Sequence, residues 1–460
     1  MPNPSFIDRL TDIVGPHGLL LEPQDKEPFL QDWRGLFRGD AVAVVRPRNV
    51  HEVAAVVAQC ADAGIRVVPQ GGNTGLAGSG VPLANDARQI VLSMSRMNAI
   101  RHIDRVGMTM EVEAGCILQT AQDAALAQGR KLAINLASEG SAQIGGVVAS
   151  NAGGIHVVRY GMARQSVLGL EIVLADGTLV NGLRHLRKDN AGYDWKQLFI
   201  GSEGTLAIIT AAVLRLSPQP RKRSVSLLAV PDAQAGLALL ARAQDELGDQ
   251  VSAFELISAV SMDLVARHSG VALPLAPGVW YVLLEVGSNF GDIDGAVEAM
   301  LEAALEAGEA VDGTIARSEA QAQQLWALRE NITEAELHQG RSIKHDISVP
   351  VGAIPDFIKE ASAAIAALSP GSTVNIFGHA GDGNLHFNVL ATADLADADA
   401  KRAVHDVVAR YNGSISAEHG IGQYRIDEML RYKSGEELGL MARIKHALDP
   451  DNTLNPGKVM

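Results

Sequence analysis

The sequence predicts an α+β protein with more than one domain, and two observations lead to this prediction. The chain has 460 residues, and because domains usually have about 150 residues, two or three domains are expected. From residue 41 to about residue 216, short apolar runs alternate with Gly-rich loops. This pattern predicts strands and helices that follow one another along the chain. The apolar runs, such as residues 207–214, are shorter than the roughly 18 residues of a membrane span. No membrane span is therefore expected.

Local signals place the first elements in order. Asn49, followed three residues later by Glu52, resembles a capping box at the start of a helix, and Gly64 ends that helix. A strand, this helix and a second strand are expected at residues 42–45, 50–63 and 65–68. Further strands are expected at residues 279–286 and 373–377, and a further helix at residues 436–448.

A run of prolines and basic residues, from Pro218 to Arg223, predicts the first domain boundary. The predicted domains are residues 1–220, residues 221–413, and a C-terminal segment, residues 414–460, that completes the active site. The middle domain mixes strands with Ala-rich helices, and the C-terminal segment is expected to be small and helical.

Composition excludes several classes of function. The formal net charge is −14 and aromatic residues make up only 4% of the chain, whereas nucleic-acid-binding proteins carry a basic surface with aromatic residues for stacking. The two cysteines, Cys60 and Cys116, are too few for a disulfide framework or an iron–sulfur cluster. The first ten residues lack the apolar stretch of a signal peptide. These features predict a cytoplasmic enzyme for a small substrate, with no nucleic-acid partner.

Two Gly-rich loops are candidates for binding a phosphorylated cofactor. The first is PQGGNTG at residues 69–75, and the second is SEGSAQIGG at residues 138–146. Glycines let backbone amides approach an anion, and hydroxyl and amide side chains add donors. The Gly-x-Gly-x-x-Gly dinucleotide motif and the phosphate loop that ends in Gly-Lys-Ser/Thr are both absent from the sequence. The alternative is that each loop is only a tight turn.

Several motifs together resemble the FAD-binding domain of the vanillyl-alcohol oxidase family. They are PRNVHEV at 47–53, PQGGNTG, AGC at 114–116, IGGVVASNAGG at 144–154 and EGTLAIIT at 203–210. The resemblance implies FAD, and since Asn73 stands where covalently flavinylated members often have His, it implies non-covalent FAD. By this resemblance the cofactor-binding residues are Gly71, Gly72, Asn73, Thr74, Gly75, Ser141, Gly145, Gly146, Asn151, Gly154, Ile208 and Asn455.

The stretch FGHAGDGNLHFN at residues 377–388 suggests a metal site. A strand leads into a Gly-Asp-Gly turn, so His379 before the turn can lie beside His386 on the next strand. Two imidazoles and a carboxylate suit a zinc-like ion, and Glu418 in AEHGIG is the candidate carboxylate, with His419 as a candidate base. The alternative is that each histidine is an ordinary surface or core residue.

The segments FGHAGDGNLHFN and AEHGIG both resemble the C-terminal half of FAD-linked D-2-hydroxy acid dehydrogenases. That resemblance implies that His379, His386 and Glu418 bind a divalent metal, zinc or alternatively manganese, and that His419 is the catalytic base and contacts substrate. In the D-2-hydroxyglutarate dehydrogenase subgroup, the residues matching Arg329, Thr333, Lys344 and Asn388 bind substrate. From the residues alone, Arg329 could equally form a surface ion pair with Glu330 or Glu334, and Lys344 could end a strand. Asp382, inside the turn, is expected to be structural.

The resemblance implies FAD- and metal-dependent oxidation of a D-2-hydroxy acid to a 2-oxo acid. D-2-hydroxyglutarate is the first candidate substrate and D-malate the second; D-lactate or glycolate, the latter as an oxidase subunit, are alternatives. The expected electron acceptor is an electron-transfer flavoprotein or a quinone-linked carrier, and a homodimer is one candidate oligomeric state. An alternative from another class is a hydrolase that uses a water on the same metal.

Overall fold

The computed structural model describes residues 4–86, 88–270 and 273–460 and divides into two compact units. Unit 1 comprises Met1–Gly153, Met162–Gln219 and His419–Met460, and unit 2 comprises Gly154–Gly161 and Pro220–Glu418. The sequence analysis assigns residues 154–161 to the first domain, but the structure places them in unit 2. Gly154 and Gly161 flank this excursion with φ angles of 109° and 76°, which glycine adopts without strain.

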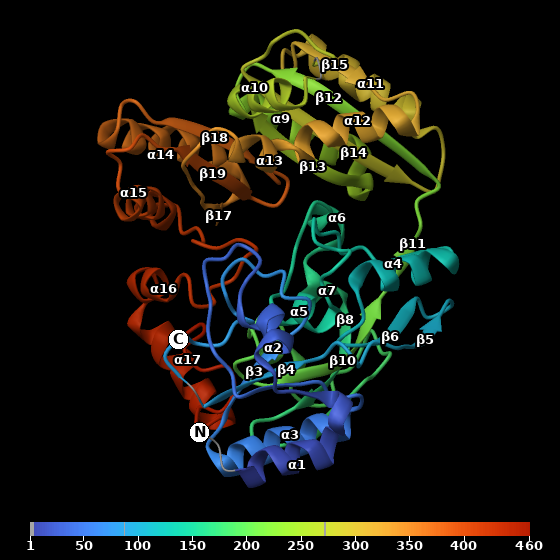
Figure 1. Cartoon of the computed structure of the whole chain (residues 1–460). Helices are drawn as coiled ribbons and strands as arrows, with labels where there is room; N and C mark the ends of the chain where they lie inside the picture. Colours follow the sequence, from blue (N-terminus) through green and yellow to red (C-terminus); the bar gives the residue numbers. More distant parts are fainter. Residues whose placement is uncertain (1–3, 87, 271–272) are drawn as a thin grey trace. The chain divides into compact units, whose positions relative to one another are not determined.

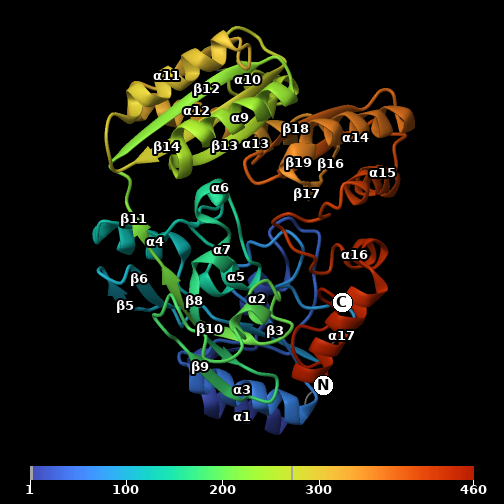
Figure 2. The same ribbon diagram turned by 180° about the vertical axis from the view of Figure 1, so that it is seen from behind.

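Unit 1 contains a four-stranded sheet in the order β1-β2-β4-β3. Its strands are β1 (Leu19–Leu20), β2 (Ala43–Val45), β3 (Arg66–Gln70) and β4 (Gln89–Ser93); β2, β4 and β3 are parallel, and β1 is antiparallel to β2. Helix α3 (Val50–Ala63) connects β2 to β3, and α1 (Pro4–Val14) packs beside α3 (Figures 1 and 2). The predicted cap is confirmed, because the Asn49 side chain accepts a 3.0 Å hydrogen bond from the Glu52 amide.

A second sheet of unit 1 is antiparallel, in the order β5-β6-β10-β8-β9. Its strands are β5 (Ile100–Asp104), β6 (Thr109–Glu113), β8 (Val167–Val173), β9 (Leu179–Gly182) and β10 (Ile208–Arg215). Helices α4 (Leu118–Ala127) and α5 (Ile144–Ala149) bury apolar side chains in the same core. The other short elements here are η1 (Pro16–Gly18), α2 (Pro23–Leu30), β7 (Arg130–Lys131), α7 (Ala163–Ser166), α8 (Lys196–Phe199) and β11 (Ser217–Pro218).

The C-terminal segment of unit 1 contains α16 (Ile426–Tyr432) and α17 (Gly435–Leu448) and ends beside β3. The Val67 amide donates to the Thr453 carbonyl, and the Asn455 amide donates to the Val67 carbonyl, both at 2.8 Å. The last residues of the chain therefore extend the first sheet past β3. Ser434 and Glu437 form a capping box at the start of α17, one residue before the predicted start of this helix.

Unit 2 is built on an eight-stranded antiparallel sheet with the path β15-β12-β14-β13-β18-β19-β16, and β17 also pairs with β19. Its strands are β12 (Lys222–Val230), β13 (Val251–Ser258), β14 (Trp280–Ser288), β15 (Asp312–Ile315), β16 (Ser342–Ile343), β17 (Asp346–Ser348), β18 (Thr373–Gly378) and β19 (Asn384–Leu390). Both strands expected in this region, β14 and β18, are present within three residues of their predicted bounds.

Helices cover both faces of the unit 2 sheet. Leu256 of β13 faces Gly236 of α9, while Ala253 and Ile257 belong to a core shared with α10, α12 and α13. The helices are α6 (Val157–Tyr160), α9 (Ala233–Leu247), α10 (Ala259–Ser269), α11 (Ile293–Glu306), α12 (Glu319–Glu330), α13 (Ile332–Leu337), α14 (Ile354–Leu368) and α15 (Asp397–Arg410), with η2 (Gly248–Gln250) and η3 (Val351–Ala353). Because side chains alternate along a strand, Glu255 of β13 is directed to the face covered by α10, α12 and α13.

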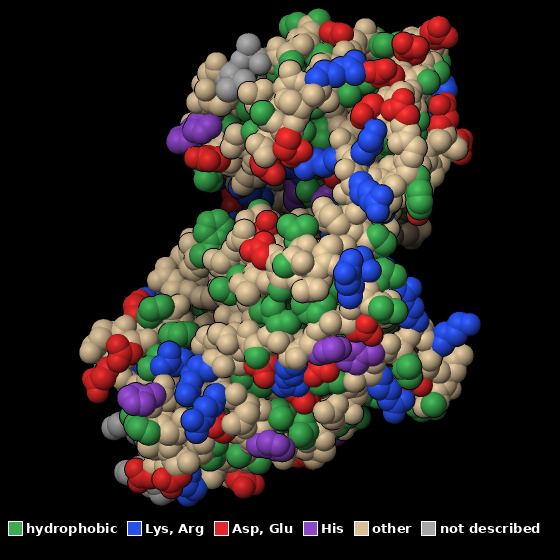
Figure 3. Space-filling model, turned by 90° about the vertical axis from the view of Figure 1, so that its right-hand side faces the viewer, with side chains coloured by type: hydrophobic (Ala, Val, Ile, Leu, Met, Phe, Trp, Pro, Cys, Tyr) green, Lys and Arg blue, Asp and Glu red, His purple; other side chains and the backbone are tan. Residues whose placement is uncertain are grey.

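The surface carries both signs of charge. On the face that Figure 3 shows, Lys, Arg, Asp and Glu side chains are scattered among apolar and neutral ones. None of the helices in the described part of the chain has the length and hydropathy that crossing a membrane requires.

Candidate functional site

A pocket in unit 1 brings the two Gly-rich loops together. It is lined by residues of the first loop, the second loop and the start of β10, and His419 also lines it. The lining includes eight of the predicted cofactor residues: Gly71, Gly72, Asn73, Thr74, Gly75, Gly145, Gly146 and Ile208. The parallel strand β3 delivers the first loop to this pocket, and α5 begins at the second loop.

The glycines of the pocket serve two different purposes. A Cβ added at Gly72 would lie 2.0 Å from the Ser141 carbonyl oxygen, so this glycine lets the two loops pack against each other. At Gly75 and Gly146, by contrast, an added Cβ would meet no heavy atom within 4 Å among the described residues other than its own chain neighbours and, for Gly146, the backbone of its own helix. Backbone at these two positions therefore faces open space inside the pocket, as expected of a surface that an extended phosphorylated cofactor covers.

Four predicted cofactor residues lie outside the set that lines this pocket. Ser141 supports Gly72 from the second loop, and Gly154 belongs to unit 2, where its amide donates to Glu418 Oε1 at 2.6 Å. Asn151 accepts a 2.9 Å hydrogen bond from the Arg164 amide. Asn455 donates to the Ser79 and Glu203 carbonyls, and its buried Oδ1 has no hydrogen-bond partner among the described residues.

Glu203 positions the loop that carries His419. Its carboxylate accepts hydrogen bonds from the Ile421 amide at 2.8 Å, the Gly422 amide at 2.9 Å and the Ser79 hydroxyl. A Cβ at Gly420 would lie 2.7 Å from Glu203 Oε1, so the loop fits closely around this carboxylate. Glu203 lies in the EGTLAIIT motif, but its partners are 124 to 219 residues away in sequence, and the sequence analysis did not assign it a role.

In unit 2, the structure brings His379, His386 and Glu418 together. One ligand atom from each lies within 4.8 Å of the other two. Strand pairing explains the two histidines, because Phe377 of β18 is opposite His386 of β19 and His379 follows two residues later. Glu418 is held by its own amide, which donates to Asp346 Oδ2 at 3.0 Å. Two nitrogens and one carboxylate oxygen form a donor set that suits a zinc-like ion.

Glu255 orients the first of these histidines. Its carboxylate is fully buried and bonds His379 Nδ1 on one side and Arg329 Nε, at 2.5 Å, on the other. Burial raises the pKa of Glu255, but the charges of His379 and Arg329 outweigh burial and lower it to about 2. Burial lowers the pKa of His379, and Glu255 outweighs this effect and raises it to about 9. A proton held on Nδ1 leaves Nε2 of His379 directed at the ligand cluster.

Asp382 occupies the turn between the two histidines. Its Oδ1 accepts a 3.1 Å hydrogen bond from the Asn384 amide two residues later, which is the geometry of an Asx turn. Burial raises the pKa of Asp382 to about 6.

The predicted substrate residues fall into three environments. Arg329 of α12 is only 8% exposed and bonds the buried Glu255, so the surface ion pair with Glu330 or Glu334 that the sequence allowed does not describe it. Thr333 is exposed on α13, a separate helix, because the chain leaves α12 at Asn331. Arg329 and Thr333 are therefore not successive positions on one helix.

Lys344 and Asn388 share a second buried carboxylate, Glu336. Asn388 Nδ2 and Asn375 Nδ2 donate to Glu336 Oε2 at 2.8 and 2.7 Å, and Lys344 Nζ lies 3.8 Å from Oε1. The Lys344 side chain is 34% exposed, whereas Asn388 is buried. Of the cations predicted to bind substrate, Lys344 is thus the more accessible to a small anion.

The two units therefore offer different chemistry. The unit 1 pocket offers backbone amides and an imidazole, which suit an extended cofactor and proton transfer. The unit 2 cluster offers two imidazoles, a carboxylate and nearby cations, which suit a divalent ion and an anionic ligand.

Two family models match the chain. The model described as "FAD binding domain" matches residues 41–182, and the model described as "FAD linked oxidases, C-terminal domain" matches residues 219–459. The second match covers more than half of the chain.

Curated relatives match along almost the whole chain. A Bos taurus protein named "D-2-hydroxyglutarate dehydrogenase, mitochondrial" is 40% identical over 451 residues, covering 97% of this chain and 82% of its own length. A Xanthomonas citri protein named "D-2-hydroxyglutarate dehydrogenase" is 40% identical over 449 residues, covering 96% of this chain and 94% of its own length.

Solved structures share the fold. An alkyldihydroxyacetonephosphate synthase aligns with a TM-score of 0.77 at 18% identity, covering 99% of this chain and 86% of its own. A p-cresol methylhydroxylase with bound substrate aligns with a TM-score of 0.75 at 16% identity, covering 99% and 96% of the two chains. The expected α+β fold of the vanillyl-alcohol oxidase type is confirmed.

The predicted cytoplasmic localisation is wrong as judged by these comparisons. Eukaryotic relatives, including those of Bos taurus and Arabidopsis thaliana at 40% and 37% identity, are named mitochondrial. The prediction relied on composition and on the first ten residues, and neither feature identifies a compartment.

Proposed function

This chain belongs to the FAD-linked D-2-hydroxy acid dehydrogenases of the vanillyl-alcohol oxidase family, and on that premise we propose that it oxidises D-2-hydroxyglutarate to the 2-oxo acid. D-malate is the second candidate substrate. The observation that carries the proposal is the 40% identity, along 97% of the chain, to an enzyme named D-2-hydroxyglutarate dehydrogenase. A metal-dependent hydrolase is not supported, because both matched family models describe FAD proteins.

We propose that FAD binds non-covalently in the unit 1 pocket. The open space at Gly75 and Gly146 supports this assignment, since a cofactor can approach the backbone there. Asn73 lies in the loop where covalently flavinylated members often have His, and its Nδ2 donates to the Gln31 carbonyl at 2.8 Å. Acid denaturation should therefore release the flavin, and flavin that stays on the denatured chain would contradict this part of the proposal.

We propose that His379, His386 and Glu418 hold one divalent ion, zinc or manganese. The mutual spacing of their ligand atoms and the bond from His379 Nδ1 to Glu255 support this assignment. A bound ion would supply Lewis acidity that lowers the pKa of the substrate hydroxyl.

In the proposed mechanism, His419 accepts the proton of the substrate hydroxyl as the C2–H bond breaks. Bound FAD supplies the acceptor for the hydride, and this chemistry belongs to the cofactor. Glu203 keeps the loop of His419 in place through its bonds to the Ile421 and Gly422 amides. Electrons then pass to an electron-transfer flavoprotein or a quinone-linked carrier.

For the substrate's second carboxylate we propose Lys344 as the main partner. Lys344 is partly exposed and its Nζ lies 3.8 Å from Glu336, whereas Arg329 is buried and bonded to Glu255. A charge-assisted hydrogen bond to that carboxylate would contribute about 1.5–3 kcal/mol. Loss of one such contact corresponds to roughly one to two powers of ten in kcat/KM.

The test is a dye-linked assay with D-2-hydroxyglutarate, D-malate, D-lactate and glycolate, before and after chelation, on wild type and Lys344→Met. The wild type should favour D-2-hydroxyglutarate over D-lactate by roughly one to two powers of ten in kcat/KM, and Lys344→Met should remove most of this preference. Chelation should abolish turnover while the flavin spectrum stays intact. Equal efficiency of the wild type on D-lactate and D-2-hydroxyglutarate would contradict the dicarboxylate assignment.

A further inference from the structure

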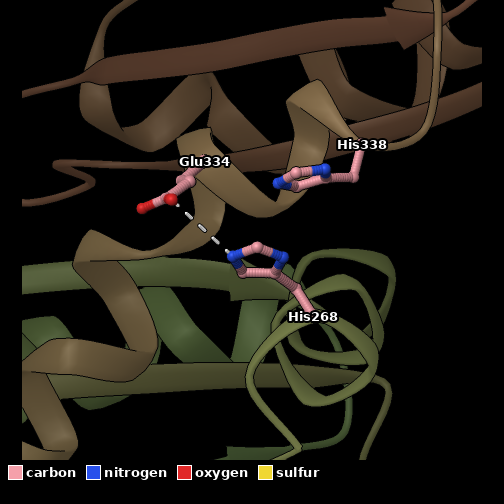
Figure 4. Close-up of side chains that lie close together, drawn as sticks. All are labelled: His268, Glu334 and His338. Carbon is pink, nitrogen blue, oxygen red and sulfur yellow. Dashed lines mark ion pairs between the residues drawn. The ribbon is translucent and has the colours of Figure 1, made fainter.

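A second group of two histidines and one glutamate lies on the surface of unit 2, apart from the residues assigned above. His268 is in the last turn of α10, Glu334 is on α13, and His338 directly follows α13. Figure 4 shows the two imidazole rings facing each other, with the Glu334 carboxylate beside them. The ring centroids are 4.4 Å apart and the ring planes are 21° apart, so the rings are stacked.

The ligand atoms of this group are already close to the spacing that an ion requires. His268 Nε2 lies 3.8 Å from Glu334 Oε1, and the three ligand atoms all lie within 4.8 Å of one another. A zinc ion with bonds of about 2.1 Å holds tetrahedral donors roughly 3.4 Å apart. All three residues lie at the surface. A bound ion must lie in the plane of each imidazole, so the rings have to turn out of their stacked arrangement by rotation about χ1 and χ2, and at the surface this rotation leaves the core undisturbed.

The two helices that carry the group are packed into one apolar core. Met262 and Val265 of α10 and Ile332 and Ala335 of α13 are buried in one apolar core. The two helices therefore present His268, Glu334 and His338 from fixed positions, which reduces the conformational entropy lost when an ion binds.

We propose that His268, Glu334 and His338 form a second divalent-cation site, of the zinc class, that clamps α10 to α13. Two imidazole nitrogens and one carboxylate oxygen favour zinc-like ions over calcium or magnesium, which prefer oxygen ligands. Solvent completes the coordination, because the group lies open at the surface. The clamp holds the helix that also carries Glu336, the buried carboxylate bonded to Asn388.

The test counts zinc in holoenzyme that has been stripped with a chelator and re-equilibrated with micromolar Zn²⁺. The variants are His386→Ala, which removes a ligand of the proposed central site, and the same variant combined with His268→Gln. His386→Ala should hold one zinc per chain, and the double variant should hold none. Added Zn²⁺ should also raise the unfolding midpoint of His386→Ala, and it should leave the midpoint of the double variant unchanged.

A matched control replaces an exposed histidine outside these groups. His51 is exposed on α3, and His51→Gln in the His386→Ala background should keep the zinc. The proposal is overturned if His386→Ala holds no zinc, or if the double variant with His268→Gln still holds it. Failure of the central site is a different result: wild type would then hold one zinc, unchanged by His386→Ala and lost in His268→Gln.

Discussion

The pocket of unit 1 is shaped by backbone, whereas the ligand cluster of unit 2 is shaped by side chains held on buried carboxylates. In the pocket, the decisive contact is a glycine against a carbonyl, Gly72 against Ser141. In the cluster, the decisive contacts run from His379 and Arg329 to Glu255, and from Asn388 to Glu336. Mutations should therefore damage the two regions in different ways. The unit 1 pocket should be sensitive to added side-chain volume, and the unit 2 cluster should be sensitive to the loss of a buried charge.

The largest effect is expected from a β-branched residue at Gly72. Gly72→Val should abolish flavin binding and destabilise unit 1, because its Cβ would lie 2.0 Å from the Ser141 carbonyl oxygen. Gly75→Ala is the matched control, since its Cβ meets no heavy atom of the described residues within 4 Å. The control apoprotein should fold normally and bind flavin more weakly. Flavin absorbance of the purified variants measures cofactor binding, and the unfolding midpoints of the two apoproteins measure stability. Equal stability of the two variants would mean that the contact between Gly72 and Ser141 does not limit packing in unit 1.

His419→Ala tests the one side chain of the unit 1 pocket to which we assign a chemical role. The variant should keep its FAD and metal and lose flavin reduction by on the order of 10²–10⁴-fold, the contribution of a general base. Stopped-flow measurement of flavin bleaching with substrate gives the rate. A variant that reduces its flavin at the wild-type rate would assign the base elsewhere.

Glu255→Gln tests the carboxylate that supports the cluster. The substitution should weaken metal affinity or activity by about 10–100-fold, because His379 Nδ1 loses the negative charge of its buried carboxylate partner and the new amide group can also turn its NH2 toward the ring. Glu285→Gln is the control, since Glu285 is also buried on this sheet but bonds His156 and Trp326 instead. The control should lose stability with its metal affinity unchanged, as measured by competition with a chromogenic chelator. Equal loss of metal in both variants would mean that removing any buried carboxylate of this sheet weakens metal binding, and that the bond from Glu255 to His379 has no specific role.

Lys458 sharpens the contrast in charge through an effect on stability rather than on activity. Its Nζ is buried in unit 1 without a hydrogen-bond partner among the described residues, and burial lowers the pKa of Lys458 from 10.5 to about 7. The unfolded chain therefore binds more protons between these values, so stability should rise with pH from about 7 to about 10.5. Lys458→Met should stabilise the protein by roughly 3–5 kcal/mol at pH 6 and flatten this rise.

The control for Lys458 is a buried lysine with partners. Lys445 Nζ bonds Asp449 at 2.5 Å and the Thr205 and Leu454 carbonyls at 2.8 and 2.9 Å. Lys445→Met should destabilise, since Asp449 would remain buried without this cation. Urea midpoints at pH 6 and pH 9.5, followed by flavin fluorescence, compare the two. A lower urea midpoint for Lys458→Met than for wild type at pH 6 would mean that the Lys458 ammonium group makes a stabilising contact in the folded protein.

The sequence predicted the features that depend on residues close together in the chain. The cap at Asn49, the Gly-rich loops and the turn between His379 and His386 all depend on neighbours in sequence, and the structure has them at the expected positions. The helix break at Asn331 was not predicted, because no proline or glycine marks it.

The supporting carboxylates could not be found in the same way. Glu255 lies 124 residues from His379, and Glu203 lies 218 residues from Ile421. A glutamate on a strand resembles any exposed polar position until the sheet and its covering helices show that it is buried. Strand alternation would have found Glu255 only if the inner face of β13 had been known.

The pairing of the C-terminal residues with β3 has a consequence for biosynthesis. Thr453 and Asn455 bond Val67, and Arg66 donates to the Asp451 and Asn452 carbonyls. A ribosome that has translated the first half of the chain has therefore made a sheet whose edge beyond β3 is still unprotected. Unit 2 emerges in the interval, and unit 1 closes this edge only when residues 451–455 leave the exit tunnel. A chain that stops before residue 451 would keep the edge of β3 open, which makes it a target for chaperones and proteases.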